Sequence, residues 1–306
     1  MPSISVIIPL YNHARYIGEA LQSVLGQTSP VDEIIVLDDG SKDNSAAVAE
    51  AALRGQANAR VIRQTNRGAH NTINRLVEDS RGDYLAILNS DDAFVPTKIE
   101  RCRSLLSRTP QIELIAGKVQ LMDDESRPVR SGVTVDWLER ADNFFREFNL
   151  EQLAILNENS ITTTSNMVFS RSLWQRCAGF QDLRYCHDLD FLMAAYNFGK
   201  VAIDRENDHI IYRLHRHNTI KEDLAAIRVE IALVIAAALH DSGTRVINDA
   251  FEAGNLHAFH RFLQNKNLTE LVCTSLLWRS RFKERTEFYD FMSAPGKRQL
   301  LREFVK

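Results

Sequence analysis

Asp-Tyr-Leu-Ala-Ile-Leu-Asn-Ser-Asp-Asp is the sequence of residues 83–92, and it decides the fold prediction. Its apolar part is typical of a buried strand, and Asp91 and Asp92 follow that strand directly. Two neighbouring carboxylates are costly to bury unpaired, but at a strand end they can face a cleft and hold a hard divalent cation. Open α/β sheets bind ligands at that edge. Because Asp-Asp alone also begins turns and helices, the preceding residues must support this interpretation.

Strands and helices alternate over the residues that precede this stretch. Short β-branched runs predict strands, and apolar residues at helical spacing predict the helices between them. The predicted strands are 4–9, 33–37 and 60–62, and the predicted helices are about 15–25, 46–53 and 70–78. This order predicts an α/β protein with a mostly parallel, Rossmann-like sheet flanked by helices. The polar loops after the second, third and fourth strands should then meet at one edge.

Four motifs occur in a fixed order over the first 100 residues. They are Ser-Val-Ile-Ile-Pro-Leu-Tyr-Asn at 5–12, Asp-Asp-Gly-Ser-Lys-Asp at 38–43, Asn-Arg-Gly at 66–68, and Asn-Ser-Asp-Asp at 89–92. Together they resemble family 2 glycosyltransferases of the GT-A fold, and a weaker match extends to about residue 220. The resemblance implies an inverting transferase that uses a nucleotide-diphosphate sugar and Mg²⁺ or Mn²⁺. Each motif alone would be an ordinary turn or helix cap.

The resemblance also assigns residues to the nucleotide sugar. Tyr11 would stack on the nucleobase. Asp39, or Asp38 beside it, would accept a hydrogen bond from a uracil N–H or a ribose hydroxyl. Arg67 would place a positive charge near the base or the phosphates. The full expected set is Pro9, Tyr11, Asp39, Arg67 and Asp91.

The expected metal ligands are Asp91, Asp92 and His215. A bound Mn²⁺ or Mg²⁺ bridges the two phosphates and stabilises the charge that develops on the leaving group. Asn89 stands where the family often has Asp, and its amide oxygen can bind a cation or a ribose but brings no charge. His215 belongs to a segment that resembles a Tyr-Arg-x-His motif, although a histidine pair such as 215 and 217 is more often on the surface.

Asp188 is the expected catalytic base. Residues 173–180 resemble the segment that precedes the base in this family, and the following helix should run from about 187 to 198. The family commonly has Glu-Asp there, so His187 replaces the Glu and Asp188 keeps the Asp. Inverting transfer needs a base that takes the proton of the acceptor hydroxyl. Asp188 also fits a helix cap, and Asp190, two residues on, should point away from it.

The predicted domain organisation is a catalytic domain followed by a helical extension. Residues 1–220 form the catalytic domain, in which 1–100 bind the nucleotide sugar and 101–220 bind the acceptor. Residues 221–306 form the extension, with helices predicted at 223–240, 246–263, 267–280 and 283–304. The apolar run 231–239 should be buried against the catalytic domain or a second subunit, so the extension is a candidate for homodimer contacts.

The last part of the chain is basic. Residues 279–306 contain eight Lys and Arg against four acids. A solvated helical face is the commoner explanation of such a pattern. The alternative is peripheral contact with an anionic membrane that holds a lipid-linked acceptor.

Composition agrees with a cytoplasmic enzyme, with the inner face of the membrane as the alternative location. The 306 residues are 44% hydrophobic, and the net charge of −3 indicates no nucleic-acid partner. Because a strand begins within a few residues, we expect no signal peptide. The four scattered cysteines fit a reducing compartment, and the longest apolar run is well short of the ~20 residues that a membrane helix needs.

We therefore expect a metal-dependent, inverting hexosyltransferase. It would move a sugar from a nucleotide-diphosphate donor, UDP-linked, to a saccharide or lipid-linked saccharide in bacterial-type surface polysaccharide assembly. The alternative is a non-catalytic nucleotide-sugar-binding protein of the same fold. A haloacid-dehalogenase-type phosphatase is excluded because Leu37 stands where its nucleophilic Asp would be. A nicotinamide-dependent dehydrogenase is excluded because no G-x-G-x-x-G follows the first strand.

Overall fold

The structure is a computed structural model that describes residues 2–216, 218 and 223–305. Contacts divide the chain into two compact units. Unit 1 contains the residues up to Arg130 together with Ile161–Phe180 and Phe198–His215, and unit 2 contains Ser131–Ser160, Gln181–Asn197 and the residues after His215. The boundary predicted after residue 220 lies outside the described residues, so the domain assignment stays a prediction.

Unit 1 is built on a single mixed sheet in the order β3-β2-β1-β4-β7-β6-β8-β5. Its strands are β1 (Ile4–Leu10), β2 (Glu33–Asp38), β3 (Ala59–Arg63), β4 (Tyr84–Ile87), β5 (Ala93–Phe94), β6 (Ile112–Met122), β7 (Val168–Ser170) and β8 (Lys200–Arg213). The half from β3 to β4 is parallel, as predicted. In the other half, β7 runs antiparallel to β4 and β6, β5 runs antiparallel to β8, and β6 and β8 are parallel.

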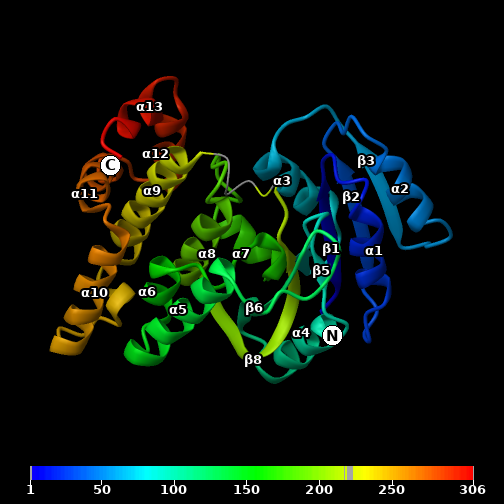
Figure 1. The fold of residues 1–306 in the computed structure, drawn as a ribbon, viewed down its shortest axis with the longest axis horizontal. Helices are drawn as coiled ribbons and strands as arrows, with labels where there is room; N and C mark the ends of the chain where they lie inside the picture. The colour runs from blue at the N-terminus through cyan, green and yellow to red at the C-terminus, as the bar shows by residue number, and fades with distance from the viewer. Residues whose placement is uncertain (1, 217, 219–222, 306) are drawn as a thin grey trace. The chain divides into compact units, whose positions relative to one another are not determined.

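The parallel half of the sheet has helices on both faces. Since β1, β2 and β3 are neighbours in chain order, right-handed crossovers put α1 (Ile17–Leu25) and α2 (Ser45–Ala52) on one face. Figure 1 shows both helices beside these strands. The return to β4 puts α3 (Ala69–Asp79) on the other face. Continuous apolar strands are the expected result of this double covering, and it explains why β1 and β2 could be predicted from their sequences.

The remaining helical segments of unit 1 are α4 (Lys98–Arg108), the 3₁₀ turn η1 (Thr164–Asn166) and α7 (Arg171–Arg176). The turn η1 directly precedes β7, which lies next to β4 in the sheet. Residues 163–165 therefore come close to the carboxyl end of β4. This proximity matters for the acidic pair that follows β4.

Unit 2 is helical in the part of the chain that the structure describes. Its helices are α5 (Val133–Phe148), α6 (Glu151–Asn157), α8 (His187–Phe198), α9 (Leu224–Ser242), η3 (Gly243–Ile247), α10 (Ala253–Lys266), α11 (Thr269–Arg279), α12 (Arg285–Ser293) and α13 (Lys297–Arg302). Within the run 231–239, residues 232–238 are buried, and α9 packs on α11 and α13 of the same unit. The apolar surface that suggested a dimer contact is therefore covered by the chain itself.

The helix predicted over 283–304 is wrong, because the structure breaks it into α12 and α13. The break contains Pro295, which lacks a backbone N–H and cannot continue a helix. It also contains Gly296, whose φ of +83° favours glycine. The helix predicted from residue 246 begins later, at Ala253. None of the helices in the described ranges combines the length and the apolar character that crossing a membrane requires.

Candidate functional site

The loops at the carboxyl ends of β1 and β2 are bonded to each other. The amide of Asn12 donates to Ser41 Oγ at 2.9 Å, and the Asn12 side-chain oxygen accepts from the amide of Lys42 at 2.7 Å. Asn12 has a φ of 53°, in the left-handed region that Asn tolerates. The loop after β1 also reaches the end of β4, where His13 Nδ1 lies 2.8 Å from Ser90 Oγ. The edge therefore gathers several loops around the one that follows β1.

Asp39 fixes the loop that follows β3. Its Oδ1 accepts from Gln64 Nε2 and from the amide of Arg67, both at 2.8 Å, and its Oδ2 accepts from the amide of Gly68 at 3.0 Å. The side chain is buried. Gly40 is required beside it, because its φ is +76° and a Cβ would lie 3.0 Å from a backbone nitrogen of the same loop. Asp39 thus positions the backbone that carries Arg67.

Other residues predicted for the nucleotide remain accessible or unsatisfied at this edge. Asp38 is buried, and its Oδ1 has no hydrogen-bond partner in the described part of the chain. Tyr11 is 42% exposed, Arg67 is exposed and Pro9 is half-buried at the end of β1. A buried carboxylate oxygen without a donor is expensive. Asp38 is therefore better placed than Asp39 to accept a hydrogen bond from a ligand.

His13, Asp91 and His215 form a group that can hold a metal ion. One ligand atom from each of the three lies within 4.8 Å of the others. His215 Nε2 is 2.9 Å from Asp91 Oδ2, and Tyr16 stacks on the His215 ring with centroids 5.4 Å apart. Burial raises the pKa of Asp91, but the hydrogen bond from His215 and the charges of both histidines outweigh it. The pKa therefore lies below its ordinary value, and the carboxylate stays ionised.

Two imidazoles and one carboxylate are suitable ligands for a divalent transition metal, while an all-oxygen set suits Mg²⁺ better. His13 offers one of its two ring nitrogens to this group, and its Nδ1 also lies 2.8 Å from Ser90 Oγ. A cation here would be bound by Asp91 and His215, as the sequence predicts, together with His13. This group therefore favours Mn²⁺ over Mg²⁺ among the two expected ions.

Asp92 lies outside this group. Its carboxylate is buried and accepts from Ser165 Oγ at 2.6 Å, Thr163 Oγ1 at 3.3 Å and the amide of Arg213 at 3.1 Å. Burial, with the neighbouring charge of Asp91, raises the pKa of Asp92 to about 8. Asp92 therefore links the end of β4 to the loop before β7 and to the end of β8.

Asn89 is bound to the same loop. Its Nδ2 donates to Thr163 Oγ1 at 2.8 Å, and its Oδ1 accepts from Thr164 Oγ1 at 2.9 Å. An Asp at this position could accept from these hydroxyls but could not donate. The departure from the family pattern at Asn89 is thus matched by partners within the chain.

Arg213 connects the strand ends around Asp91. Its guanidinium is buried and donates to the carbonyl of Asp91 at 2.8 Å and to Ser126 Oγ at 2.8 Å. It also pairs with Glu19 at 2.5 Å and lies over the Tyr16 ring, 4.9 Å from its centroid. In the motif at 212–215, Arg213 therefore organises the site while His215 faces Asp91. His217 lies outside the described residues.

Asp188 belongs to unit 2, where it lies in the first turn of α8. It is half-buried and accepts from Asn159 Nδ2 at 3.2 Å. Burial raises its pKa to about 6. The ring of His187 donates from Nδ1 to the carbonyl of Leu183 at 3.2 Å, and burial lowers its pKa. A carboxylate with a raised pKa is suited to accept a proton near neutral pH.

Asp190 is occupied within unit 2. Its carboxylate pairs with Arg285 and accepts from the hydroxyl of Tyr289. It is 1% exposed. The structure therefore separates the roles of two acids that are only two residues apart.

His13 and Tyr16 belong to the site but are not among the residues predicted from the sequence. A lone histidine in a loop carries no spacing signal, and Tyr16 resembles an ordinary first residue of a helix. Their proximity to His215 depends on β8 ending beside the loop after β1. The one available signal was the position of His13, two residues after Tyr11 in the first motif.

The family model for glycosyl transferase family 2 matches residues 5–177. An uncharacterized glycosyltransferase of Rickettsia felis is 35% identical over 130 residues, which cover 42% of this chain and 21% of the relative. The uncharacterized glycosyltransferase RP339 of Rickettsia prowazekii is 27% identical over 207 residues, which cover 67% of this chain and 62% of the relative. The match thus spans about a fifth of the first of these relatives and less than two thirds of the second.

Solved structures of S. aureus TarS share the fold. The complex of TarS 1-349 with UDP-GlcNAc has a TM-score of 0.60 at 16% identity, and the match covers 91% of this chain and 89% of that one. TarS 1-349 without a named ligand has a TM-score of 0.57 at 18% identity, covering 99% and 91%. At such identities the likeness concerns the fold, and it confirms the expected GT-A architecture. The chain belongs to glycosyl transferase family 2.

Proposed function

We propose that this glycosyltransferase moves a sugar from a UDP-linked donor to a hydroxyl group with inversion at the anomeric carbon. The observation that carries the proposal is the convergence of the loops after β1, β2, β3 and β4 around Asp38, Asp39 and the His13–Asp91–His215 group. The likeness to TarS, whose structures hold UDP or UDP-GlcNAc, supports a uridine nucleotide. A saccharide or lipid-linked saccharide in surface polysaccharide assembly is the proposed acceptor.

The donor site divides its work between accessible and buried groups. Tyr11 would stack on the base, and the free Oδ1 of Asp38 would accept from uracil or ribose. Arg67 would approach the diphosphate from a loop that Asp39 holds in place. Because Asp39 already binds two backbone amides, its contribution to affinity is mainly the shape of that loop.

A divalent cation, when bound, would neutralise the charge that develops on the departing UDP. Asp91, His215 and His13 would hold it. Asp92 already accepts from Ser165 and from the amide of Arg213, and it lies outside the His13–Asp91–His215 group, so we assign it a supporting role. Arg213 would keep the backbone of Asp91 in place.

Asp188 would take the proton from the acceptor hydroxyl as that oxygen attacks the anomeric carbon. The new bond forms on the face opposite the diphosphate, so a single displacement gives an inverted product. The pKa of Asp188 is raised to about 6, so its carboxylate is more basic than that of an ordinary Asp. It is still mostly ionised at neutral pH, because this pKa lies below 7.

Two other contacts stay proposals. The tail exposes Leu300 and Phe304 near basic residues, which would fit peripheral contact with the inner face of an anionic membrane. The protein should then co-sediment with vesicles that contain anionic lipid, and it should not co-sediment with neutral vesicles. The second contact is a homodimer through the C-terminal helices. Light scattering tests it by measuring the molar mass of the protein in solution.

A screen of nucleotide sugars by thermal shift, with and without Mn²⁺, tests the donor assignment. A specific ligand raises the melting temperature because it stabilises the native state by RT ln(1 + [L]/Kd). The donor selected by the screen is then used to follow UDP release in the presence of acceptor glycosides. A donor that binds but never reacts would favour the alternative, a non-catalytic nucleotide-sugar-binding protein.

Asp39→Ala is expected to weaken UDP binding by about 10-fold or more. The change removes the acceptor of two backbone amides, and hydrogen bonds to charged groups contribute about 1.5–3 kcal/mol each. The loop that carries Arg67 should then no longer be held in the position that Asp39 gives it. Isothermal titration calorimetry with UDP measures the effect.

Asp79→Ala is the matched control, because Asp79 is a partly exposed acid that pairs with Arg75 one turn away within α3. Its UDP affinity should equal that of the parent protein. Unchanged UDP affinity in Asp39→Ala would count against this edge as the nucleotide site. A preference for dTDP or GDP over UDP would overturn only the uridine assignment.

A further inference from the structure

Glu230 is a buried carboxylate in α9. It is 3% exposed, and the residues that follow it in the helix are apolar. A charge in such surroundings is tolerated only when it is paired and hydrogen-bonded. The partners of Glu230 therefore indicate what it does.

Those partners are three successive backbone amides in the segment that leads into α8. Glu230 Oε1 accepts from the amide of Arg184 at 2.9 Å, and Oε2 accepts from the amides of Tyr185 and Cys186 at 2.7 and 3.1 Å. The carbonyl of Cys186 in turn accepts from the amide of Asp190 at 2.9 Å, which begins the hydrogen bonding of α8. One carboxylate thus fixes the backbone immediately before the helix.

Arg298 of α13 completes the arrangement. Its Nη1 lies 3.3 Å from Glu230 Oε1, and its Nη2 donates to the carbonyl of Asp182 at 2.5 Å and to Ser293 Oγ at 2.7 Å. The charge of the buried carboxylate is balanced by this pairing. The segment from Asp182 to Cys186 is therefore held by two helices that lie late in the sequence.

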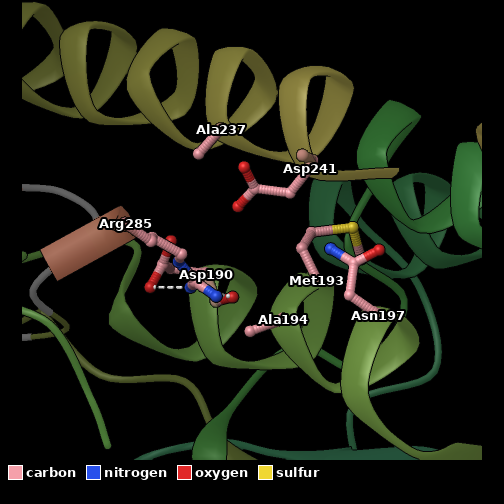
Figure 2. Close-up of a pocket in the computed structure, with 8 residues that line it drawn as sticks. Asp190, Met193, Ala194, Asn197, Ala237, Asp241 and Arg285 are labelled. Carbon is pink, nitrogen blue, oxygen red and sulfur yellow. Dashed lines mark hydrogen bonds and ion pairs between the residues drawn. The ribbon is translucent and has the colours of Figure 1, made fainter. Parts of the chain in front are cut away.

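The residues after Asp188 are held in a similar way. Arg285 of α12 pairs with the carboxylate of Asp190 and donates to its carbonyl at 2.6 Å, and Tyr289 donates to the same carboxylate. Figure 2 shows Asp190 and Arg285 side by side in a small crevice that Asp241 of α9 also lines. The backbone on both sides of Asp188 is thus anchored to the C-terminal helices.

We propose that Glu230, together with Arg298, is a positioning residue for Asp188. Glu230 holds the amides of residues 184–186, so that the carboxylate of Asp188 in the first turn of α8 keeps one orientation. The proposal rests on the proposed function of Asp188 as the base. A displacement of the base by about 1 Å can cost up to ~10²-fold in rate, while nucleotide binding by unit 1 does not depend on it.

Glu230→Gln is the first test. It keeps the size of the side chain but replaces one accepting oxygen with an NH₂ group, which cannot accept from the amides. We expect kcat for transfer to fall by about 10-fold or more with UDP affinity unchanged. Hydrogen exchange should become faster at the amides of residues 184–186 and stay the same in β1 and β2.

Asp223→Asn is the matched control. Asp223 also belongs to the start of α9, where it caps the amide of Ala226 at 3.0 Å and pairs with Arg302 at 2.6 Å. It therefore loses a comparable charge without losing an acceptor of residues 184–186. Its kcat and its exchange at 184–186 should match the parent protein.

A double-mutant cycle separates positioning from general stability. If Glu230 acts through Asp188, then Glu230→Gln should lower turnover no further in an Asp188→Asn background. Should Glu230→Gln fail to fold, Arg298→Gln takes its place in the same cycle, with a smaller loss expected because the three amides keep their acceptor.

Three outcomes overturn a specific part of the proposal. Full kcat in Glu230→Gln despite faster exchange at 184–186 would leave Asp188 as the base and remove the positioning role. An equal further loss in the Asp188→Asn background would make Glu230 a purely structural residue. Near-normal turnover of Asp188→Asn alone would overturn the base assignment itself.

Discussion

Asp188→Asn is expected to lower kcat for sugar transfer by ~10²-fold or more, the usual scale for the loss of a positioned base. Asn is nearly isosteric and can keep its contact with Asn159 if the two amides orient suitably, so folding should survive. UDP binding should be unchanged, because the nucleotide residues belong to unit 1. Acceptor-dependent UDP release measures kcat, and calorimetry with UDP provides the control.

The same residue predicts a pH dependence. Asp188 accepts a proton only when it is ionised, and burial raises its pKa to about 6 from an ordinary value near 3.8. The rate constant kcat/KM should therefore fall as the pH decreases through about 6, by about tenfold per unit below it. This fall of kcat/KM at low pH should be absent from the residual activity of Asp188→Asn.

Near-normal turnover in Asp188→Asn would move the base elsewhere. Asp190 is then a poor substitute, since Arg285 and Tyr289 already occupy its carboxylate. A product of retained configuration, read from the anomeric coupling constant in NMR, would defeat single displacement altogether.

Removal of divalent metal is expected to reduce transfer to the background rate. After EDTA treatment and washing, Mn²⁺ should restore activity more effectively than Mg²⁺, because two of the three candidate ligands are imidazoles. Asp91→Asn should lower the rate of transfer by ~10²-fold or more, because the change removes the one negatively charged ligand of the group. Electron paramagnetic resonance of Mn²⁺ supplies a readout besides activity, and binding should tighten when UDP is added.

Asp83→Asn is a suitable control, because Asp83 is an exposed acid just before the opposite end of β4. Its Mn²⁺ binding and turnover should be those of the parent protein. Full activity in EDTA with a well-washed enzyme would rule out the metal requirement. Normal Mn²⁺ binding by Asp91→Asn would instead move the cation to other ligands.

The parallel half of the sheet could be predicted because its signal is local. Strands such as β1 and β2 are covered on both faces, so each is a continuous apolar run, and the loops that follow them carry the four motifs. The adjacent Pro295 and Gly296 are a local signal for the break between α12 and α13. Because the residues on either side have helical spacing, the sequence pattern nevertheless resembled one continuous helix.

The direction of each side chain in the site could not be predicted in the same way. Asp91 and Asp92 are neighbours in the sequence, yet one meets His215 and the other meets Ser165. Which way each turns depends on β7 and β8, which arrive more than 70 residues later. Likewise, Asp39 resembles a ligand-binding acid, but its oxygens face the backbone of another loop.

Glu230 carries a weak signal in the sequence. It is the one acid among the apolar residues from 229 to 239. A single carboxylate in a helix that must be buried requires a partner. The sequence could therefore have indicated a buried ion pair or an amide-binding carboxylate, although not that its partners precede Asp188.

The order in which the strands are made has a consequence for synthesis on the ribosome. β4 pairs on one side with β1, but its other neighbour, β7, begins at residue 168, and β8 ends only at residue 213. A nascent chain that has emerged as far as β6 therefore exposes an unpaired edge of β4, which is the kind of edge that promotes aggregation. We expect the sheet to close late, and chaperones that bind extended apolar segments to be needed most while residues 88–213 are being translated.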